Sequence, residues 1–556
     1  MNKIVKTFTT TLIFSAFITF TGIYNTADAQ NKEFNTGKTL EIQYNILREL
    51  SQGYVDTLNL SKIIRVGIDA MLDSIDPYTE YIPEENNEAI ELITTATYGG
   101  IGAIIKKIDS LGVLISEPYL NTPAVKFGLE PGDIILKING ADVKPLSATE
   151  CSNRMKGEPG TDVTFFVKKG RTGATKEIKV TRERVHISDV SFSGILSGNR
   201  WIEASDTLNK GKKIGYIKID GFTLGGSKDV KRALTELKER GADKIILDLR
   251  GNGGGLLEEA VNIVSLFVPK GTKVVSQMGR DSSTLVIYKT TEEPVDTAIP
   301  LMVLANSGSA SSSEIVSGSL QDLDRAKIVG TRTYGKGLVQ STAPVGYNGI
   351  IKYTIAKYYT PSGRCVQAID YSSRNSDGSI GNVPDSLKKA FKTKNGRTVY
   401  DGGGITPDIT IPSVPYSRPL IALVMNDVVN DYAISYYKKH NSIASPAQFK
   451  MTDAEYSDFV KYAASKQFDT RSSAQVELEQ MIKSAKEENL YNINKTEFEA
   501  LEKRLSMSKE QLLTVKREEI QPVVEQEIAA KYYFTPGRME TIIQTDAQLH
   551  KAIKCF

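Results

Sequence analysis

Residues 306–315 read Asn306-Ser307-Gly308-Ser309-Ala310-Ser311-Ser312-Ser313-Glu314-Ile315. The apolar run 301–305 before them is short, as expected of a buried strand, and apolar residues at helical spacing follow them. We therefore expect a strand, a turn of small residues, and a helix that begins at the serines with Glu314 in its first turn. A hydroxyl at that place meets the positive end of the helix dipole, where a developing oxyanion would also be stabilised.

A second segment, residues 330–340, reads Gly330-Thr331-Arg332-Thr333-Tyr334-Gly335-Lys336-Gly337-Leu338-Val339-Gln340. Lys336 stands between two glycines just after a short apolar run, which is an uncommon place for a solvated charge. Each segment also has a simpler interpretation, since serine runs often form flexible linkers and a single lysine usually lies on the surface. The apolar segments on both sides of the serine run weigh against a linker.

Together these segments resemble the signature of the carboxy-terminal processing proteases, which are serine peptidases with a Ser/Lys dyad. The matching pieces are Gly308-Ser309-Ala310-Ser311, Ser313-Glu314-Ile315, Gln321-Asp322, Arg325-Ala326, Thr333-Tyr334-Gly335-Lys336-Gly337 and Val339-Gln340. The resemblance implies that Ser311 is the nucleophile, Lys336 the general base and Gln340 the residue that orients the lysine. The separation of 25 residues between Ser311 and Lys336 also matches the family.

The composition argues against several other classes of protein. The 556 residues imply several domains, and 40% hydrophobic with 24% charged residues are ordinary values for a folded soluble protein. A net charge of +3 gives no case for a nucleic-acid partner. The three cysteines and three histidines form no ligand-like cluster, which argues against a disulfide framework, a zinc site and a Ser-His-Asp triad. We expect no metal and no organic cofactor.

Residues 1–29 have the pattern of an export signal. Lys3 and Lys6 give a basic start, residues 12–24 are mostly apolar, and Ala27-Asp28-Ala29 is a small-x-small cleavage site. The apolar part is short for a membrane-spanning helix, which favours cleavage over an uncleaved anchor or a buried N-terminal helix. We expect an exported, periplasmic protein. Its only expected association with a membrane is proximity to one, and the sequence does not decide whether this occurs.

Residues 30–95 are expected to form an N-terminal helical region, because apolar residues recur there at helical spacing. The sequence Asp76-Pro77-Tyr78-Thr79 should break this pattern. The segment resembles the helical N-terminal region of the same family. A generic helical cap fits the residues equally well.

Residues 96–184 resemble a PDZ domain. A glycine-rich segment opens it, residues 128–133 form a turn, and the apolar strand 134–140 ends in Asn139-Gly140, a typical hairpin turn. PDZ domains bind a peptide at a sheet edge and hold its terminal carboxylate on backbone N–H groups. The resemblance implies that this role falls to Gly99, Gly100, Ile101 and Gly102, and that the partners are proteins or peptides with apolar C-terminal tails. A scaffold PDZ domain without a part in catalysis is the alternative.

The core is expected over residues 185–412. Strand-like runs at 214–219 and 244–250 alternate with helical runs at 227–238 and 256–267, which predicts an α/β layer. The loop Gly251-Asn252-Gly253-Gly254-Gly255 could bind phosphate, but it lacks the ending of a P-loop. The family resemblance implies instead that the N–H groups of Gly253 and Ser312 form an oxyanion hole.

Residues 413–556 change to charged, helix-favouring sequence, with candidate capping boxes at Thr452/Glu455 and Ser508/Gln511 and an amphipathic stretch over 509–533. This C-terminal helical region is either a solvated cap on the core or a regulatory or dimerisation domain. The sequence therefore leaves undecided whether the protein is a homodimer. The predicted fold class is α+β multidomain: a crotonase-like α/β protease core with an inserted, β-rich PDZ domain and helical regions at both ends.

The predicted function is that of an exported serine endopeptidase. A lysine is normally protonated near neutrality, but burial disfavours its charged form, so a buried Lys336 could accept the proton of Ser311. Two alternatives remain at this stage. One is a catalytically silent PDZ scaffold that binds exported protein tails, and the other is an acyl-hydrolase on a related core.

Overall fold

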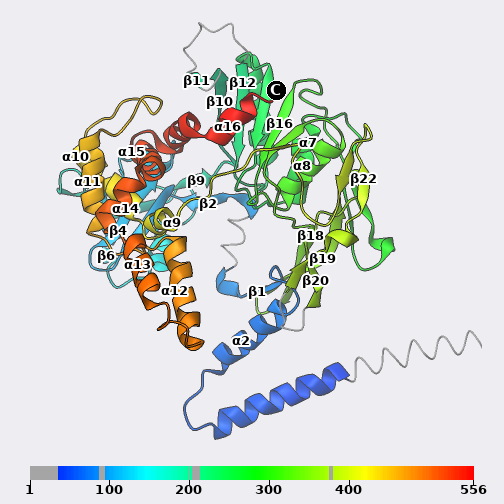
Figure 1. Cartoon of the computed structure of the whole chain (residues 1–556), viewed down its shortest axis with the longest axis horizontal. Coiled ribbons are helices and arrows are strands. Elements are labelled where there is room, and N and C mark those ends of the chain that lie inside the picture. The colour runs from blue at the N-terminus through cyan, green and yellow to red at the C-terminus, as the bar shows by residue number, and fades with distance from the viewer. Residues whose placement is uncertain (1–34, 87–93, 198–199, 203–212, 375–379) are drawn as a thin grey trace, which may run out of the picture. The chain divides into compact units, whose positions relative to one another are not determined.

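The structure is a computed structural model that describes residues 35–86, 94–197, 200–202, 213–374 and 380–556 (Figure 1). The described residues form two compact units, one made of those up to residue 82 with 342–353, and the other of those between 83 and 341 with those from 354 onward. The predicted signal peptide, residues 1–29, lies outside the described residues. Within the described ranges, no helix combines the length and the apolar character needed to span a bilayer.

The first unit contains a helix at residues 35–53, helix α2 (Leu60–Asp73) and strand β1 (Glu80–Ile82). The side chain of Asp76 accepts the N–H groups of Tyr78 and Thr79 at 2.8 Å each, which fixes the turn where the helical pattern was predicted to break. Strand β1 then pairs with residues 350–352, so this part of the predicted helical region is a short strand.

The PDZ-like part of the second unit is a sheet in the order β3-β4-β5-β7-β8, with β6 paired to β5. Its elements are β3 (Ala103–Ile108), β4 (Gly112–Pro118), α4 (Pro123–Lys126), β5 (Ile134–Ile138), β6 (Ala141–Asp142), α5 (Ala148–Met155), β7 (Asp162–Lys168) and β8 (Thr175–Thr181). Asn139 and Gly140 have φ values of 50° and 81°, as a type I′ hairpin turn requires, which confirms the predicted turn. Among the described strands, β3 lies at the edge of this sheet.

Strand β2 (Thr97–Gly100) pairs with β9 (Glu183–His186), and this ribbon leads from the PDZ sheet into the core. The core sheet has the order β11-β10-β12-β13-β16-β17-β24 and is parallel from β12 to β24. Its strands are β10 (Val190–Ser197), β11 (Arg200–Ile202), β12 (Lys213–Ile219), β13 (Lys244–Asp248), β16 (Leu301–Ala305), β17 (Lys327–Gly330) and β24 (Ile409–Thr410).

Helices α6 (Gly226–Glu239), α7 (Leu257–Ser265) and α8 (Ser312–Asp322) cover one face of the core sheet (Figure 1). They follow strands β12, β13 and β16, so the predicted alternation of strands and helices is confirmed. The remaining strands lie outside the core sheet: β14 (Lys273–Met278), β15 (Val286–Lys289), β18 (Leu338–Gly346), β19 (Gly349–Tyr359), β20 (Ile369–Arg374), β21 (Ile380–Asn382), β22 (Ala390–Lys392) and β23 (Thr398–Tyr400).

The C-terminal region is helical, as predicted. Its helices are α9 (Arg418–Met425), α10 (Val428–Lys439), α11 (Asp453–Ala464), α12 (Ser473–Glu487), α13 (Lys495–Leu505), α14 (Lys509–Val515), α15 (Arg517–Thr545) and α16 (Ala547–Ile553). Both predicted capping boxes are present, at the starts of α11 and α14. The amphipathic stretch predicted over residues 509–533 is two helices that meet at Lys516, and α15 is kinked at Phe534, where φ is 57°.

The far end of this region belongs to the core. Met539, Ile543 and Leu549 pack in one buried cluster with residues of the core strands, such as Tyr216 and Met302. Helices α15 and α16 therefore cover the face of the core sheet opposite to α6, α7 and α8 (Figure 1). The C-terminal helices are more than a solvated cap, because without them this apolar face would be exposed to water.

Candidate active site

Ser311 lies at the turn between β16 and α8, as predicted, and it is the N-cap residue of the helix. Its backbone has φ 55° and ψ −113°, a conformation that side-chain-bearing residues seldom adopt. Such strain costs on the order of 1–3 kcal/mol and is found where function requires it. A serine on a sharp, strained strand-to-helix turn is also the arrangement of the nucleophile in α/β-hydrolases.

The serine run is a fixed part of the core. The hydroxyl groups of Ser309, Ser312 and Ser313 donate to backbone carbonyl groups of residues 249–255 at 2.8, 2.8 and 2.9 Å. Ser309 and Ser313 are fully buried, and Ser312 is 1% exposed. The alternative of a flexible polar linker is therefore excluded, because each of these hydroxyl groups holds the run against the glycine-rich loop.

Glu314 connects the nucleophile turn to the segment that carries Lys336. Its Oε2 accepts the N–H of Ser311 at 3.0 Å and the N–H of Lys336 at 2.8 Å. Its Oε1 accepts the N–H of Gly335 at 2.7 Å and the hydroxyl of Thr333 at 2.6 Å. One carboxylate, 0% exposed, therefore holds both predicted members of the dyad by their backbones.

Tyr358 on β19 makes a second bridge between the same two residues. Its hydroxyl donates to the backbone carbonyl of Lys336 at 2.7 Å and lies 3.2 Å from that of Ser311. Tyr358 is 1% exposed, and burial raises its pKa well above the ordinary value, so the phenol stays a donor. Lys336 itself is half-buried, which lies between the buried position predicted for the general base and a solvated surface lysine.

The glycine-rich loop lies directly against the nucleophile. A methyl group added to Gly254 would lie 2.8 Å from Cβ of Ser311 and 3.0 Å from the nitrogen of Ser312. The N–H of Gly254 is used by the side chain of Asn252 at 2.8 Å. In the described part of the chain, the N–H groups of Gly253 and Ser312 donate to no protein acceptor, so both are available for the predicted oxyanion hole.

Arg250 fixes the start of this loop. Its guanidinium donates to Asp248 at the end of β13, to Asp546 at 2.6 Å and to Gln548 at 3.0 Å. Burial alone would raise the pKa of Asp248, but the charges of Arg250 and Lys218 lower it to about 2. The loop beside Ser311 is thus tethered to residues just before and within helix α16, which sequence reasoning did not foresee.

Gln340, the predicted orienter of Lys336, lies on β18. Its amide Nε2 donates to the hydroxyl of Thr354 on β19 at 3.2 Å. This hydrogen bond holds the side-chain amide of Gln340 against the neighbouring strand of the hairpin. The orienting role of Gln340 stays a prediction.

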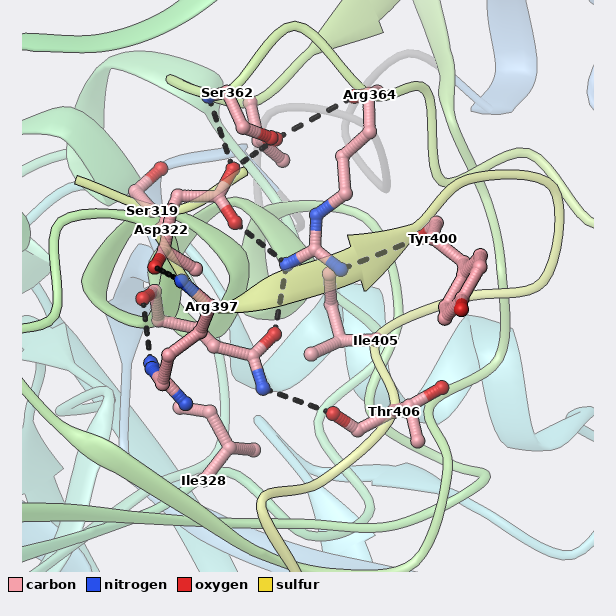
Figure 2. A network of polar contacts seen from close by, with 12 residues as sticks. Ser319, Asp322, Ile328, Ser362, Arg364, Arg397, Tyr400, Ile405 and Thr406 are labelled. Carbon is pink, nitrogen blue, oxygen red and sulfur yellow. Dashed lines mark hydrogen bonds and ion pairs between the residues drawn. The ribbon is translucent and has the colours of Figure 1, made fainter. Parts of the chain in front are cut away.

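The far end of α8 is anchored by a buried ion pair, shown in Figure 2. Arg364, 1% exposed, donates from Nη2 to Asp322 at 2.8 Å and to Gln321 at 2.7 Å. Asp322 also accepts the hydroxyl of Thr360 and the N–H of Ser362. The network holds the helix whose first residue follows Ser311, and it joins the Gln321-Asp322 segment to residues 360–364.

The residues predicted to bind a peptide carboxylate divide into two pairs. Gly99 and Gly100 lie in β2, opposite Arg184 and Glu183 of β9, and a methyl group on Gly99 would lie 2.0 Å from the carbonyl oxygen of Gly157. Close backbone packing thus explains the small size of Gly99, whereas a methyl group on Gly100 would meet the ring of Tyr98 at 2.7 Å. Ile101 and Gly102 form the loop before β3, where Gly102 has φ 76°. The loop therefore lies beside the edge strand β3, as a peptide-binding role requires.

The PDZ domain is clamped to the C-terminal helices through its strand β4. Glu117 on β4, 4% exposed, pairs with Arg538 at 2.5 Å and lies 3.7 Å from Lys531. Glu527 completes the cluster by pairing with Arg538 at 3.0 Å. A second contact joins β3 to helix α10, since Lys106 lies 2.9 Å from Asp427. We call the set Glu117, Glu527, Lys531 and Arg538 the four-charge cluster.

Comparison with known families assigns the three main parts of the chain. The profile described as "Peptidase family S41" matches residues 213–372, and the profile described as "PDZ domain" matches residues 99–181. The profile described as "Probable PDZ-protease, C-terminal helical domain" matches residues 420–556.

Two curated proteins and one solved structure illustrate the likeness. The chain is 32% identical over 326 residues to the "Probable CtpA-like serine protease" of Staphylococcus aureus, which covers 58% of this chain and 61% of that protein. The solved "photosystem II D1 C-terminal processing protease" is 25% identical, with 66% of this chain and 92% of that chain covered and a TM-score of 0.34. The "Carboxy-terminal-processing protease" of Bartonella bacilliformis is 33% identical over 343 residues, which covers 61% of this chain and 75% of that protein. On this last match, and with the glycine-rich loop, the serine turn and the lysine segment joined in one site, the chain belongs to the carboxy-terminal processing protease family.

Proposed function

We propose that this protein is an exported serine endopeptidase that recognises C-terminal tails of proteins through its PDZ domain and cleaves peptide bonds with Ser311 and Lys336. The observation that carries the proposal is the double bridge between these residues. Glu314 binds both of their backbone N–H groups, and Tyr358 binds the carbonyl of Lys336 and lies close to that of Ser311. Two residues 25 positions apart in sequence are thereby held as one unit.

In the proposed reaction, the neutral amine of Lys336 takes the proton of the Ser311 hydroxyl as its oxygen attacks the peptide carbonyl carbon. The carbonyl oxygen becomes an oxyanion that accepts the N–H groups of Ser312 and Gly253. Lys336 returns the proton to the leaving amine, and the C–N bond breaks to leave an ester on Ser311. Water then hydrolyses the ester by the same route, which regenerates the serine.

The PDZ domain supports the choice of substrate. Strand β3 is an edge strand, and Ile104 on it is 45% exposed, so an extended peptide with apolar side chains could pair there. The loop at Ile101 and Gly102 stands at the start of that strand, where backbone N–H groups can receive a terminal carboxylate. We therefore propose protein tails with an apolar C-terminus as substrates.

The test of this function uses matched peptides. Unstructured polypeptides with an apolar tail are incubated with the protein and with Ser311→Ala, and mass spectrometry identifies the products. We expect cleavage upstream of the tail by the wild type alone. Amidation of the C-terminus should raise KM by about 10- to 100-fold, because hydrogen bonds to a charged group contribute about 1.5–3 kcal/mol. Intact peptides in every reaction would favour a silent tail-binding scaffold.

Export is a separate part of the proposal. It is supported by the basic start, the short apolar run and the site at Ala27-Asp28-Ala29. N-terminal sequencing of the protein isolated from its native cells should begin at Gln30. A chain that retains residues 1–29 would contradict cleavage of the signal.

A further inference from the structure

The carboxylate of Glu314 is a buried acceptor of four hydrogen bonds at the site. Each of its oxygens receives two donors, the N–H groups of Ser311 and Lys336 on Oε2 and the Gly335 N–H and Thr333 hydroxyl on Oε1. The distances lie between 2.6 and 3.0 Å. Three of the four donors are backbone N–H groups, which cannot reverse their direction without a change in the backbone.

This arrangement tolerates only the ionised carboxylate. A protonated carboxyl group carries its own hydrogen on one oxygen. On Oε2 that hydrogen would point at two backbone N–H donors, and on Oε1 it could be accepted only if the Thr333 hydroxyl stopped donating and turned round. At least one of the four hydrogen bonds must then break. A break on Oε2 releases the N–H of Ser311 or of Lys336, whereas a break on Oε1 loosens only the segment 333–336.

We propose that Glu314 is a positioning residue, and that its negative charge is what holds Ser311 and Lys336 at the separation needed for proton transfer. This inference rests on the proposed function of those two residues. It assigns to the site a second group that must lose its proton before the enzyme can act.

Burial raises the pKa of Glu314 to about 7, although its four hydrogen bonds oppose the shift. The carboxyl group would thus titrate near neutral pH. The charge of Glu314 also acts on two other titratable groups, Tyr358 on β19 and Cys365 after it. Burial raises the pKa of both, so Tyr358 and Cys365 stay neutral as Glu314 ionises.

The consequences for activity and for stability have opposite signs. Activity requires Glu314 ionised and Lys336 neutral, so two protons must leave, and kcat/KM should fall with a limiting slope of two on the acid side. Stability behaves differently, since the pKa of Glu314 is raised in the folded state from 4.5 to about 7. The stabilisation from its bound proton is complete below about 4.5 and is lost as the pH rises through about 7.

The experiment compares pH profiles of kcat/KM for the wild type, Glu314→Gln and Thr333→Val with one peptide substrate. Glu314→Gln keeps the shape of the side chain, but its amide NH2 group would face two hydrogen-bond donors. We therefore expect kcat to fall on the order of 10²-fold, with KM little changed. Its acid limb should have a slope of one, and its stability should depend less on pH between 5 and 7. Thr333→Val removes one donor that stabilises the ionised carboxylate of Glu314. Its kcat/KM profile should therefore keep the slope of two, and the acid limb of the profile should move to higher pH.

Glu259→Gln is the matched control. Glu259 is also buried, at 6% exposed, and its carboxylate accepts two backbone N–H groups, those of Gly225 and Ser227, away from the dyad. This variant should keep the wild-type slope. A slope of two in Glu314→Gln, or an unshifted limb in Thr333→Val if the former does not fold, would overturn the inference. A wrong assignment of the Ser311/Lys336 dyad would show itself separately, because Lys336→Ala would then still cleave the peptide.

Discussion

Lys336→Ala should reduce kcat for cleavage of a tailed peptide by on the order of 10⁴-fold while the fold is retained. Without the amine, no group at the site takes the proton of Ser311, and the N–H groups of the oxyanion hole alone give little rate. Lys336→Arg should be as inactive, because a guanidinium keeps its proton at any working pH. Initial rates and circular dichroism of the purified variants are the measurements.

Lys289→Ala serves as the control, since this lysine is exposed on β15 and should leave kcat unchanged. Substantial cleavage by Lys336→Ala would show that another group is the base. Activity in Lys336→Arg would show that the lysine acts by its charge, and the proposed proton transfer would then be wrong.

Arg538→Met should destabilise the protein by about 3–5 kcal/mol, because it leaves Glu117 buried with a weakened set of partners. Glu117 is 4% exposed, and its close contact is the 2.5 Å pair with Arg538, while Lys531 lies 3.7 Å away. Burial already lowers the pKa of Lys531, so this lysine is a poor substitute for the lost charge. Urea denaturation followed by circular dichroism gives the free energy of unfolding.

A matched substitution outside the cluster is Arg471→Met. Arg471 pairs with Asp469 and Glu479 on the surface, where ion pairs contribute little, so its unfolding midpoint should stay close to that of the wild type. Equal midpoints for the two variants would mean that the four-charge cluster does not hold the PDZ domain on the C-terminal helices.

Much of the fold could be predicted from the sequence, because its local patterns agree with its tertiary structure. The run 301–305 is a fully buried strand, and such a strand reads as a continuous apolar run. The Asn139-Gly140 turn was predicted because Gly, and to a lesser degree Asn, tolerate positive φ. Glu314 carried a signal too, since Ser311-x-x-Glu314 is a capping-box spacing, although its contacts with the lysine segment are not local.

Other features depend on residues that are far apart in the chain. The tether from Arg250 to Asp546, the bridge from Tyr358 to Lys336 and the pairing of Glu117 with Arg538 leave no periodic pattern in the sequence. The role of α16 as a cover for the core sheet was missed for the same reason, because its seven residues resemble any amphipathic helix. The strand β1 was missed because it is three residues long.

The tether of Arg250 bears on how the enzyme is made. The guanidinium that fixes the loop beside Ser311 is bound by Asp546, a residue 296 positions later in the chain. Until the ribosome has released that residue, the loop lacks this anchor and one side of the core sheet lacks its cover. Synthesis from the N-terminus thus delays completion of the site beside Ser311 until residue 546 has been added to the chain.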